Sequence, residues 1–202
     1  MAKSTTPELD KAAKAIVKSY PKQIALRDGR AITLRLMNAG DRDAMLKFAR
    51  ALQPDDLLFL RSNITEKSAV ENWIANIGTG HTVTILACEK DDIAGYASLH
   101  LNEANWMRHI GEIRLLTGAR FRSLGLGRVL ASEVFGAGRS LGMRKLSAQM
   151  TLDQAGARAT FERLGFKAEA LLADWVISAD GRTRDLLVMA YDLDGLTDTI
   201  DS

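Results

Sequence analysis

The chain has 202 residues, 47% of them hydrophobic and 26% charged, so it can bury one ordinary core and is not a disordered chain. Its 27 basic and 25 acidic residues are mixed and leave a net charge of +2, which disfavours a nucleic-acid-binding protein, since such proteins carry a concentrated basic patch. No segment has the roughly 18 consecutive apolar residues of a membrane helix, and the single cysteine, Cys88, excludes an internal disulfide. We therefore expect a cytoplasmic protein whose partners are neither nucleic acids nor membranes.

Apolar residues at helical spacing and the residues that end helices define the elements of the N-terminal part. They predict an amphipathic helix over residues 7–20, followed by a strand over residues 31–36. One further helix ends before Pro54, and the next one, for which Thr65 supplies the cap, ends at Gly78. Two helices are therefore expected between the first strand and the second.

The rest of the chain alternates between β-rich runs and helical stripes. Residues 82–89 and 93–101 predict a hairpin of antiparallel strands, since only Lys90-Asp91-Asp92 separates them. The other predicted elements are strands at 110–117, 145–150, 167–177 and 183–192, helices at 126–141 and 155–164, and a turn at Ala179-Asp180-Gly181. This order predicts one mixed α/β sheet with helices on both faces.

A glycine-rich segment joins the strand at 110–117 to the helix that follows. It reads Arg122-Ser123-Leu124-Gly125-Leu126-Gly127-Arg128. A helix N-terminus presents unpaired N–H groups and about half a positive charge, and glycine lets a phosphate approach them closely. The segment fits neither a Walker loop, which needs Gly-Lys-Ser/Thr, nor the dinucleotide pattern, because Leu130 replaces its third glycine. It indicates a pyrophosphate site of another kind, or glycines that only turn a strand into a helix.

This Arg-x-x-Gly-x-Gly segment, between a strand and a helix, resembles the acyl-CoA-binding motif of the GNAT superfamily. A second motif of that family is a helix ending in aromatic-x-x-Leu-Gly-Phe, and residues 161–166, Phe-Glu-Arg-Leu-Gly-Phe, are similar to it. The element order also resembles the family's fold, a mostly antiparallel sheet with helices on both faces. The resemblance implies an N-acetyltransferase that uses acetyl-CoA, with a helical extension at 1–23, the GNAT domain at 24–195 and a flexible tail at 196–202.

The same resemblance assigns residues to the cofactor. It implies that backbone N–H groups of the glycine turn hold the pyrophosphate, and that the main chain of the preceding strand pairs with the pantetheine arm. Arg122 and Arg128 can add positive charge beside the phosphates, or each can be an exposed arginine at a helix start. The residues implied are Leu115, Leu116, Thr117, Arg122, Leu124, Gly125, Leu126, Gly127, Arg128 and, packed against the pantetheine, Phe161.

The catalytic assignment is less complete. Freeing an amine with a pKa near 10.4 from its proton at pH 7 costs about 4–5 kcal/mol, so a base is expected beside the thioester. Glu112 resembles the glutamate base of the protein-acetylating branches of the family; the alternatives are an ion pair of Glu112 with Arg114 or a cross-strand partner, and His109 as the base. Phe161 stands where many members carry a tyrosine that protonates the leaving thiolate, so the general acid is unassigned.

Several alternatives stay open. The lone cysteine favours direct attack in a ternary complex over an acetyl-enzyme, whereas Phe161 leaves a non-catalytic acetyl-CoA-sensing module as the alternative function. The N-terminal helix either covers the core or docks a partner, and residues 106–109 either line the acceptor pocket or anchor Trp106 in the core. The acceptor is an amine of a small molecule or of a protein, no metal site is expected, and the sequence does not decide between a monomer and a homodimer.

Overall fold

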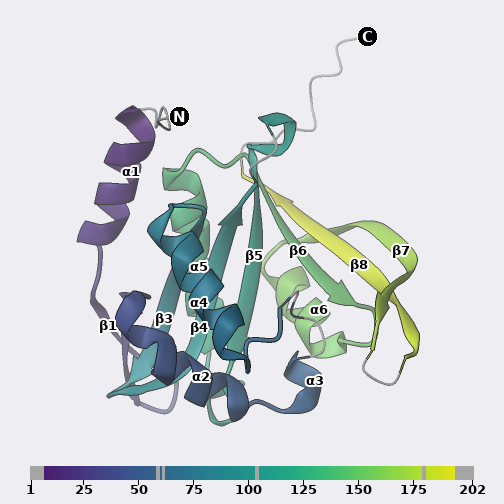
Figure 1. Cartoon of the computed structure of the whole chain (residues 1–202), viewed down its shortest axis with the longest axis horizontal. Helices are drawn as coiled ribbons and strands as arrows, with labels where there is room; N and C mark the ends of the chain where they lie inside the picture. The colour runs from purple at the N-terminus through teal and green to yellow at the C-terminus, as the bar shows by residue number, and fades with distance from the viewer. Residues whose placement is uncertain (1–6, 58–59, 61, 103–104, 179–180, 194–202) are drawn as a thin grey trace.

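One mixed sheet forms the centre of the molecule, whose computed structural model describes residues 7–57, 60, 62–102, 105–178 and 181–193. The strand order is β1-β2-β3-β4-β5-β6-β8-β7, and all neighbours are antiparallel except β5 and β6. The strands are β1 (Lys22–Ala25), β2 (Ala31–Leu36), β3 (Thr82–Glu89), β4 (Asp92–Leu101), β5 (Ile110–Thr117), β6 (Lys145–Thr151), β7 (Lys167–Ile177) and β8 (Thr183–Asp192). The predicted mixed, mostly antiparallel sheet is confirmed (Figure 1).

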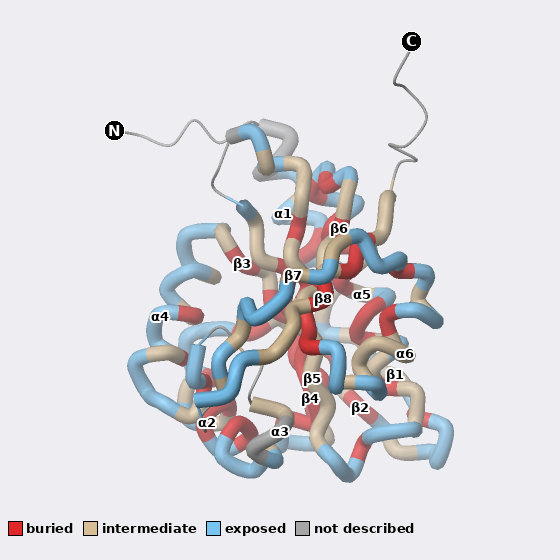
Figure 2. Tube along the Cα trace, turned by 90° about the vertical axis from the view of Figure 1, so that its right-hand side faces the viewer, coloured by how far each residue is buried: buried red, intermediate tan, exposed pale blue. Residues whose placement is uncertain are grey.

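Helices cover both faces of this sheet, and the buried residues lie along the strands between them (Figure 2). The helices are α1 (Pro7–Lys18), α2 (Arg42–Arg50), α3 (Pro54–Leu57), α4 (Lys67–Gly78), α5 (Leu126–Ser140) and α6 (Ala155–Arg163), with short 3-10 turns η1 (Ala39–Asp41), η2 (Asn105–Met107) and η3 (Ala119–Phe121). On the face of α2 and α4, Met45, Val70 and Trp73 belong to one buried cluster. On the face of α5, Leu130 and Val134 belong to a second, larger cluster. The central strands therefore have a core on each side.

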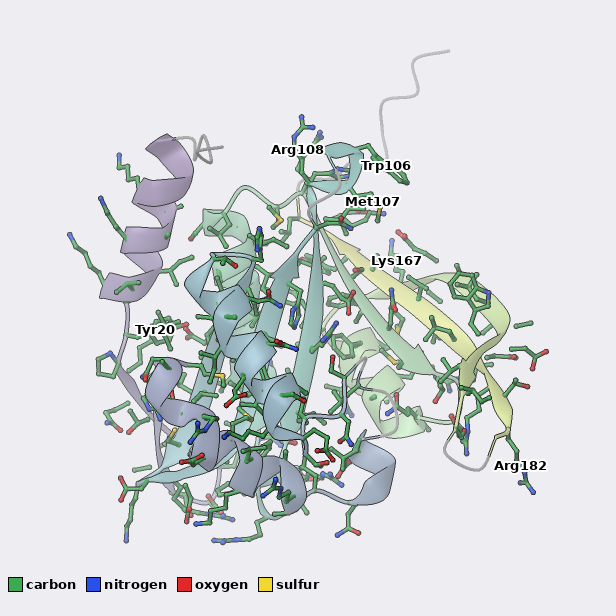
Figure 3. The ribbon with its side chains drawn as sticks, viewed as in Figure 1. Tyr20, Trp106, Met107, Arg108, Lys167 and Arg182 are labelled. Atoms are coloured by element: carbon green, nitrogen blue, oxygen red, sulfur yellow. The ribbon has the colours of Figure 1, made fainter. Side chains whose placement is uncertain are left out.

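The N-terminal helix α1 packs on α5. Ile16 is 7% exposed within the larger core cluster, while Val17 on the outer side of the helix is 59% exposed. Beyond the helix, the hydroxyl of Tyr20, labelled in Figure 3, donates a 2.7 Å hydrogen bond to the Glu133 carboxylate of α5. The same carboxylate accepts a 2.6 Å bond from Lys22. Of the two roles expected for this helix, the structure supports the one in which it covers the protein's own core.

Three local features differ from the prediction. The strand β1 was missed because its four residues are at most half-buried and give a weak pattern, yet it pairs with β2 along its whole length. The single-turn helix α3 was missed as well. Thr65 as the cap of α4 is wrong: Glu66 occupies the N-cap position, and the Thr65 hydroxyl instead donates a 2.6 Å bond to the side chain of Asn63. A local Asx turn thus competes successfully for the hydroxyl.

Two predictions concern residues outside the described ranges. They are the turn at residues 179–181, of which Ala179 and Asp180 are not described, and the tail at 196–202. The described strands β7 and β8 flank that turn as expected. Within the described ranges, no helix combines the length and the apolar character needed to cross a membrane.

Candidate active site

The parallel strands β5 and β6 are paired only near their N-terminal ends. Residues 110–112 of β5 face residues 145–147 of β6, and the two strands then diverge (Figure 1). Each keeps its other partner, because β5 pairs with β4 as far as Thr117 and β6 pairs with β8 as far as Thr151. We call the diverging edges, residues 113–117 and 148–151, the splay. The backbone groups on these two edges do not pair with each other. An extended ligand can therefore lie between the edges and hydrogen-bond to them as a strand would.

We call the closed end of the splay, where β5 and β6 still pair, its vertex. The close approach of the strands there depends on a glycine. A Cβ at Gly111 would lie 2.5 Å from Leu99 Cδ1 and 3.4 Å from Leu146 Cδ2, so a larger residue would force the neighbouring strands to shift. The carbonyl oxygen of His109 closes the vertex by accepting a 2.9 Å bond from the backbone N–H of Arg144, just before β6. Gly111 therefore allows β5 and β6 to approach closely at the vertex, the end at which the two strands pair.

The orientation of backbone groups along β5 follows from strand alternation. The carbonyl that closes the vertex faces β6, and the N–H of Gly118 donates a 2.8 Å bond to Ala94 on the β4 side. Since successive backbone groups point to opposite edges of a strand, those of Leu115 and Thr117 face the splay and those of Leu116 face β4. Of the three strand residues predicted for the pantetheine arm, Leu115 and Thr117 thus offer their backbone groups to a ligand.

The glycine turn leads from the end of β5 into α5. Ser123 and Gly125 have φ angles of 63° and 91°, in the left-handed region that favours glycine, and Gly125 is the N-cap of α5 without a side-chain cap bond. A Cβ built at Gly127 would lie 3.7 Å from Leu115 Cδ2 and 3.9 Å from Thr117 Cγ2. The first turn of α5 therefore lies against the last residues of β5, and its uncapped N–H groups adjoin the splay.

These features fit a coenzyme A molecule. The edge of β5 offers strand-like backbone bonds to an amide-bearing arm, and the uncapped start of a 15-residue helix favours a pyrophosphate. Leu124, half-buried, and Leu126, fully buried, anchor the turn from both sides of Gly125. Their backbone groups, rather than their side chains, are the ones available to a phosphate.

The two arginines predicted beside the phosphates differ in their surroundings. Arg122 forms a 2.5 Å ion pair with Asp56 of α3, so its charge is partly neutralised. Arg128 is exposed, and within the described part of the chain its side chain has no ion pair or hydrogen bond. A third arginine was missed: the Nε of Arg27, from the β1–β2 turn, lies 3.7 Å from the position of a Cβ at Gly125. No local pattern connects residue 27 with the turn; only the hairpin brings them together.

Glu112 projects from β5 on the face covered by α4. Its carboxylate accepts a 3.1 Å hydrogen bond from Nε of Arg114, and the two side chains are 16% and 24% exposed. His100 lies opposite Glu112 on β4, and Ser98 lies opposite Arg114. The ion pair of Glu112 with Arg114 is thus present, next to the vertex of the splay. His109 contributes its carbonyl group to the vertex, and its side chain is half-buried.

A cavity of about 400 Å³ lies between α4 and the strands β4 and β5. Its wall contains the aromatic pair Trp73 and Tyr96, whose ring centroids are 4.9 Å apart, and the Trp73 indole donates a 2.9 Å bond to Thr84. Burial raises the pKa of the Tyr96 phenol, which therefore stays protonated. The described lining residues are Leu60, Ser62, Ile64, Ser68, Ala69, Asn72, Trp73, Asn76, Tyr96, Ser98, His100 and Arg114. This cavity was not predicted, because its polar residues are scattered over α4, β4, β5 and the segment before α4.

The structure also gives the positions of two aromatic residues singled out in the sequence, Trp106 and Phe161. Trp106 is 79% exposed in η2, beyond the N-terminal end of β5, and it is not among the described residues lining the cavity (Figure 3). Its interpretation as a core anchor is wrong. Phe161 of α6 is 7% exposed, with its ring edge-on to Phe166 at a centroid distance of 5.0 Å. It has no hydroxyl group to donate, so contact with a pantetheine arm stays a prediction.

Solved structures share the fold of this chain. A ribosomal-protein-alanine N-acetyltransferase from Brucella melitensis is 22% identical with a TM-score of 0.70, covering 79% of this chain and 99% of its own. The yncA protein of Salmonella typhimurium, solved with its cofactor acetyl-CoA, is 20% identical with a TM-score of 0.70, covering 81% and 94%. The GNAT domain of PAT from S. lividans is 14% identical with a TM-score of 0.71, covering 86% and 97%. At these identities the likeness establishes the fold.

The family follows from the sequence match. None of the curated proteins compared with the chain matches it significantly. The family described as Acetyltransferase (GNAT) family matches residues 48–166, which include β5, the glycine turn and α6 and make up more than half of the chain. The chain therefore belongs to the GNAT acetyltransferase family, whose cofactor is acetyl-CoA.

Proposed function

We propose that this protein is an N-acetyltransferase that moves the acetyl group of acetyl-CoA directly to an amine in a ternary complex. The observation that carries the proposal is the position of β5 between two sites. The splay and the glycine turn adjoin one edge of this strand, and the cavity beside Glu112 and Arg114 adjoins one of its faces. A cofactor on the edge and an amine on the face would approach each other near Glu112.

On the cofactor side, backbone groups do most of the binding in our proposal. Leu115 and Thr117 hold the pantetheine arm, and the N–H groups of residues 124–128 hold the pyrophosphate. Acetyl-CoA supplies the thioester whose carbonyl carbon accepts the amine. A backbone N–H of β5 directed at the carbonyl oxygen stabilises the negative charge that develops there, which is worth about 10²–10³ in rate. Arg27 and Arg128 add positive charge beside the phosphates.

On the acceptor side, Glu112 takes the proton of the attacking amine. A positioned base matters because the free amine is scarce at pH 7, by about 4–5 kcal/mol. Arg114 positions the Glu112 carboxylate through its 3.1 Å bond to Oε1 of that group. The ion pair and the base role are therefore compatible, since the same arginine that stabilises the carboxylate also orients it.

Departure of the thiolate needs no dedicated acid in this proposal. A thiol with a pKa of about 8.5 leaves as a thiolate at pH 7 with a handicap near 2 kcal/mol, or roughly thirtyfold, which a water molecule can offset. A covalent acetyl-enzyme is disfavoured because the only cysteine, Cys88, is 2% exposed in the core of β3 and burial raises the pKa of its thiol. Direct attack is the remaining route.

The second candidate function is a non-catalytic module that senses acetyl-CoA, favoured by the phenylalanine at position 161. The two functions differ in one measurement: release of free CoA thiol from acetyl-CoA, with and without an amine. We expect amine-dependent release and an N-acetylated product by mass spectrometry. Binding of acetyl-CoA without any amine-dependent release, tested over amino acids, polyamines and peptide N-termini, would support the sensing module instead.

A further inference from the structure

We propose that the acceptor is a small amine that carries its own carboxylate, as an amino acid does, and that Arg114 binds this carboxylate in the cavity between α4 and β4–β5. The inference rests on the proposed function and adds the chemical class of the substrate. The cavity beside Glu112 has a volume of about 400 Å³, which is in the range of small-molecule sites.

The charge of the cavity wall points to an anionic group. Arg114 is the only residue with a permanent charge among its described lining residues, and none of these is an aspartate or glutamate. An acceptor with several ammonium groups, such as a polyamine, would leave its distal charge without a carboxylate partner there, and an unpaired charge is costly to bury. A carboxylate, in contrast, meets a planar guanidinium with parallel N–H donors.

Arg114 also has N–H donors that its bond to Glu112 does not use. It uses Nε for Glu112, and among the described residues the N–H groups of its two terminal nitrogens have no hydrogen-bond partner. Such donors on a side chain that is only 24% exposed are suited to bind a ligand oxygen. The guanidinium thus stands between two carboxylates in the complex, that of Glu112 and that of the acceptor.

The spacing of the two charged residues sets the distance between amine and carboxylate in the acceptor. Glu112 and Arg114 project from the same face of β5 and touch at 3.1 Å. A substrate that donates a proton to Glu112 and binds Arg114 must therefore carry its two groups only a few bonds apart. The rest of the substrate meets the aromatic pair Trp73 and Tyr96 and the amides of Asn72 and Asn76.

The experiment compares matched acceptors that differ only in the carboxylate. Wild-type protein is assayed for acetyl-CoA-dependent thiol release with histidine and histamine, tryptophan and tryptamine, lysine and cadaverine, the remaining amino acids, and spermidine. We expect the best acceptor to be an amino acid whose kcat/KM exceeds that of its decarboxylated counterpart by about 30-fold or more, since removing one member of a partly buried charge pair has effects of this size.

Substitutions of Arg114 test whether this residue causes the preference for acceptors with a carboxylate. Arg114→Met should remove the preference for the carboxylate by raising KM, and Arg114→Lys should restore part of it. Arg139→Met, which changes an exposed arginine at the end of α5, is the matched control and should keep the preference. Calorimetric titration of the best amino acid into the protein saturated with CoA gives a second readout that does not need turnover, and Arg114→Met should weaken this binding by a similar factor.

The outcomes separate this inference from the proposed function. Turnover of amines without a carboxylate, or of spermidine, at rates equal to or above those of the amino acids would overturn the carboxylate-bearing acceptor and leave the acetyltransferase in place. Turnover of peptide N-termini alone would overturn it in the same way. If acetyl-CoA does not raise the melting temperature of the wild-type protein at all, the cofactor assignment fails, and both proposals fail with it.

Discussion

The edge and the face of β5 are built by different means. On its edge, the splay and the glycine turn expose backbone groups, and glycine at positions 125 and 127 keeps side chains away from them. On its face, the cavity is made of side chains from α4, β4, β5 and the segment before α4. A backbone site needs only a strand, a turn and a helix in succession, so many sequences can form it for one shared cofactor. A side-chain site changes with every substitution, so it can differ between members that bind different acceptors.

The largest effect is expected on the face. Glu112→Gln should lower kcat by about 10²–10⁴ while the affinity for acetyl-CoA stays unchanged, because proton transfer is lost and the backbone site is untouched. The rate of the variant should rise toward high pH, where the amine is already neutral. The test is a pH–rate profile with the best acceptor. Wild-type kcat in Glu112→Gln would remove Glu112 from the mechanism and leave its bond to Arg114 as a structural ion pair.

The next largest effect is expected on the edge. Gly127→Val should weaken acetyl-CoA binding by about 100-fold or more, since two charge-assisted bonds to phosphate are worth about 1.5–3 kcal/mol each. A Cβ at this position would be in ordinary van der Waals contact, with the nearest atom 3.7 Å away, so the far-UV dichroism should stay close to wild type. Gly136→Val, on the exposed side of the same helix, is the control and should bind normally. Equal affinity in both variants would make Gly127 an ordinary helix residue.

A smaller effect is expected where the usual tyrosine is absent. Phe161→Tyr should change kcat by no more than roughly thirtyfold, the whole handicap of the leaving thiolate. The ring of Phe161 packs edge-on against Phe166, so the added hydroxyl must find space in a region that is 7% exposed. Melting temperature and kcat should be measured together. A larger gain in kcat at unchanged stability would mean that protonation of the thiolate limits the wild-type rate.

The smallest effects are expected from the arginines around the turn. Arg27→Ala and Arg128→Ala should each weaken acetyl-CoA binding by up to about fivefold, because exposed charge pairs contribute up to about 1 kcal/mol. Arg122→Ala should have less effect, since Asp56 already neutralises that guanidinium. The loss of affinity in the Arg27 and Arg128 variants, relative to Arg122→Ala, should become smaller as salt is added. Titration calorimetry at two salt concentrations measures it, and a dominant loss in Arg122→Ala would reverse the assignment of the arginines.

The edge was largely predictable from the sequence, because its signals are local. The strand at 110–117, the glycine turn and the helix that starts at Leu126 follow one another in the chain, and the structure has them at the predicted positions. The same holds for the helix that ends in Leu-Gly-Phe. Even so, the orientation of the Leu116 backbone toward β4 depends on strand register, which the local pattern does not contain.

The face could not be predicted in the same way, because it is assembled from distant segments. One residue beside the edge, Arg27, was missed for the same reason, because it reaches the glycine turn only through the β1–β2 hairpin and β1 gave too weak a pattern to be recognised. The cavity joins Asn76 of α4 to Arg114 of β5, and either residue alone looks like an ordinary polar surface residue. For Trp106 the sequence left burial in the core and lining of the acceptor pocket open, and the residue is exposed in η2.

The most direct test of the difference between edge and face is amide hydrogen exchange of the wild-type protein with and without acetyl-CoA. The uncapped amides at the start of α5 and the splay-facing amides of β5 should exchange freely alone and slowly in the complex. We predict that protection appears in residues 113–117 and 124–128, while the amides of α4 beside the cavity change little. Protection centred on α4, with none in the glycine turn, would contradict the account, because the cofactor would then occupy the face of β5 instead of its edge.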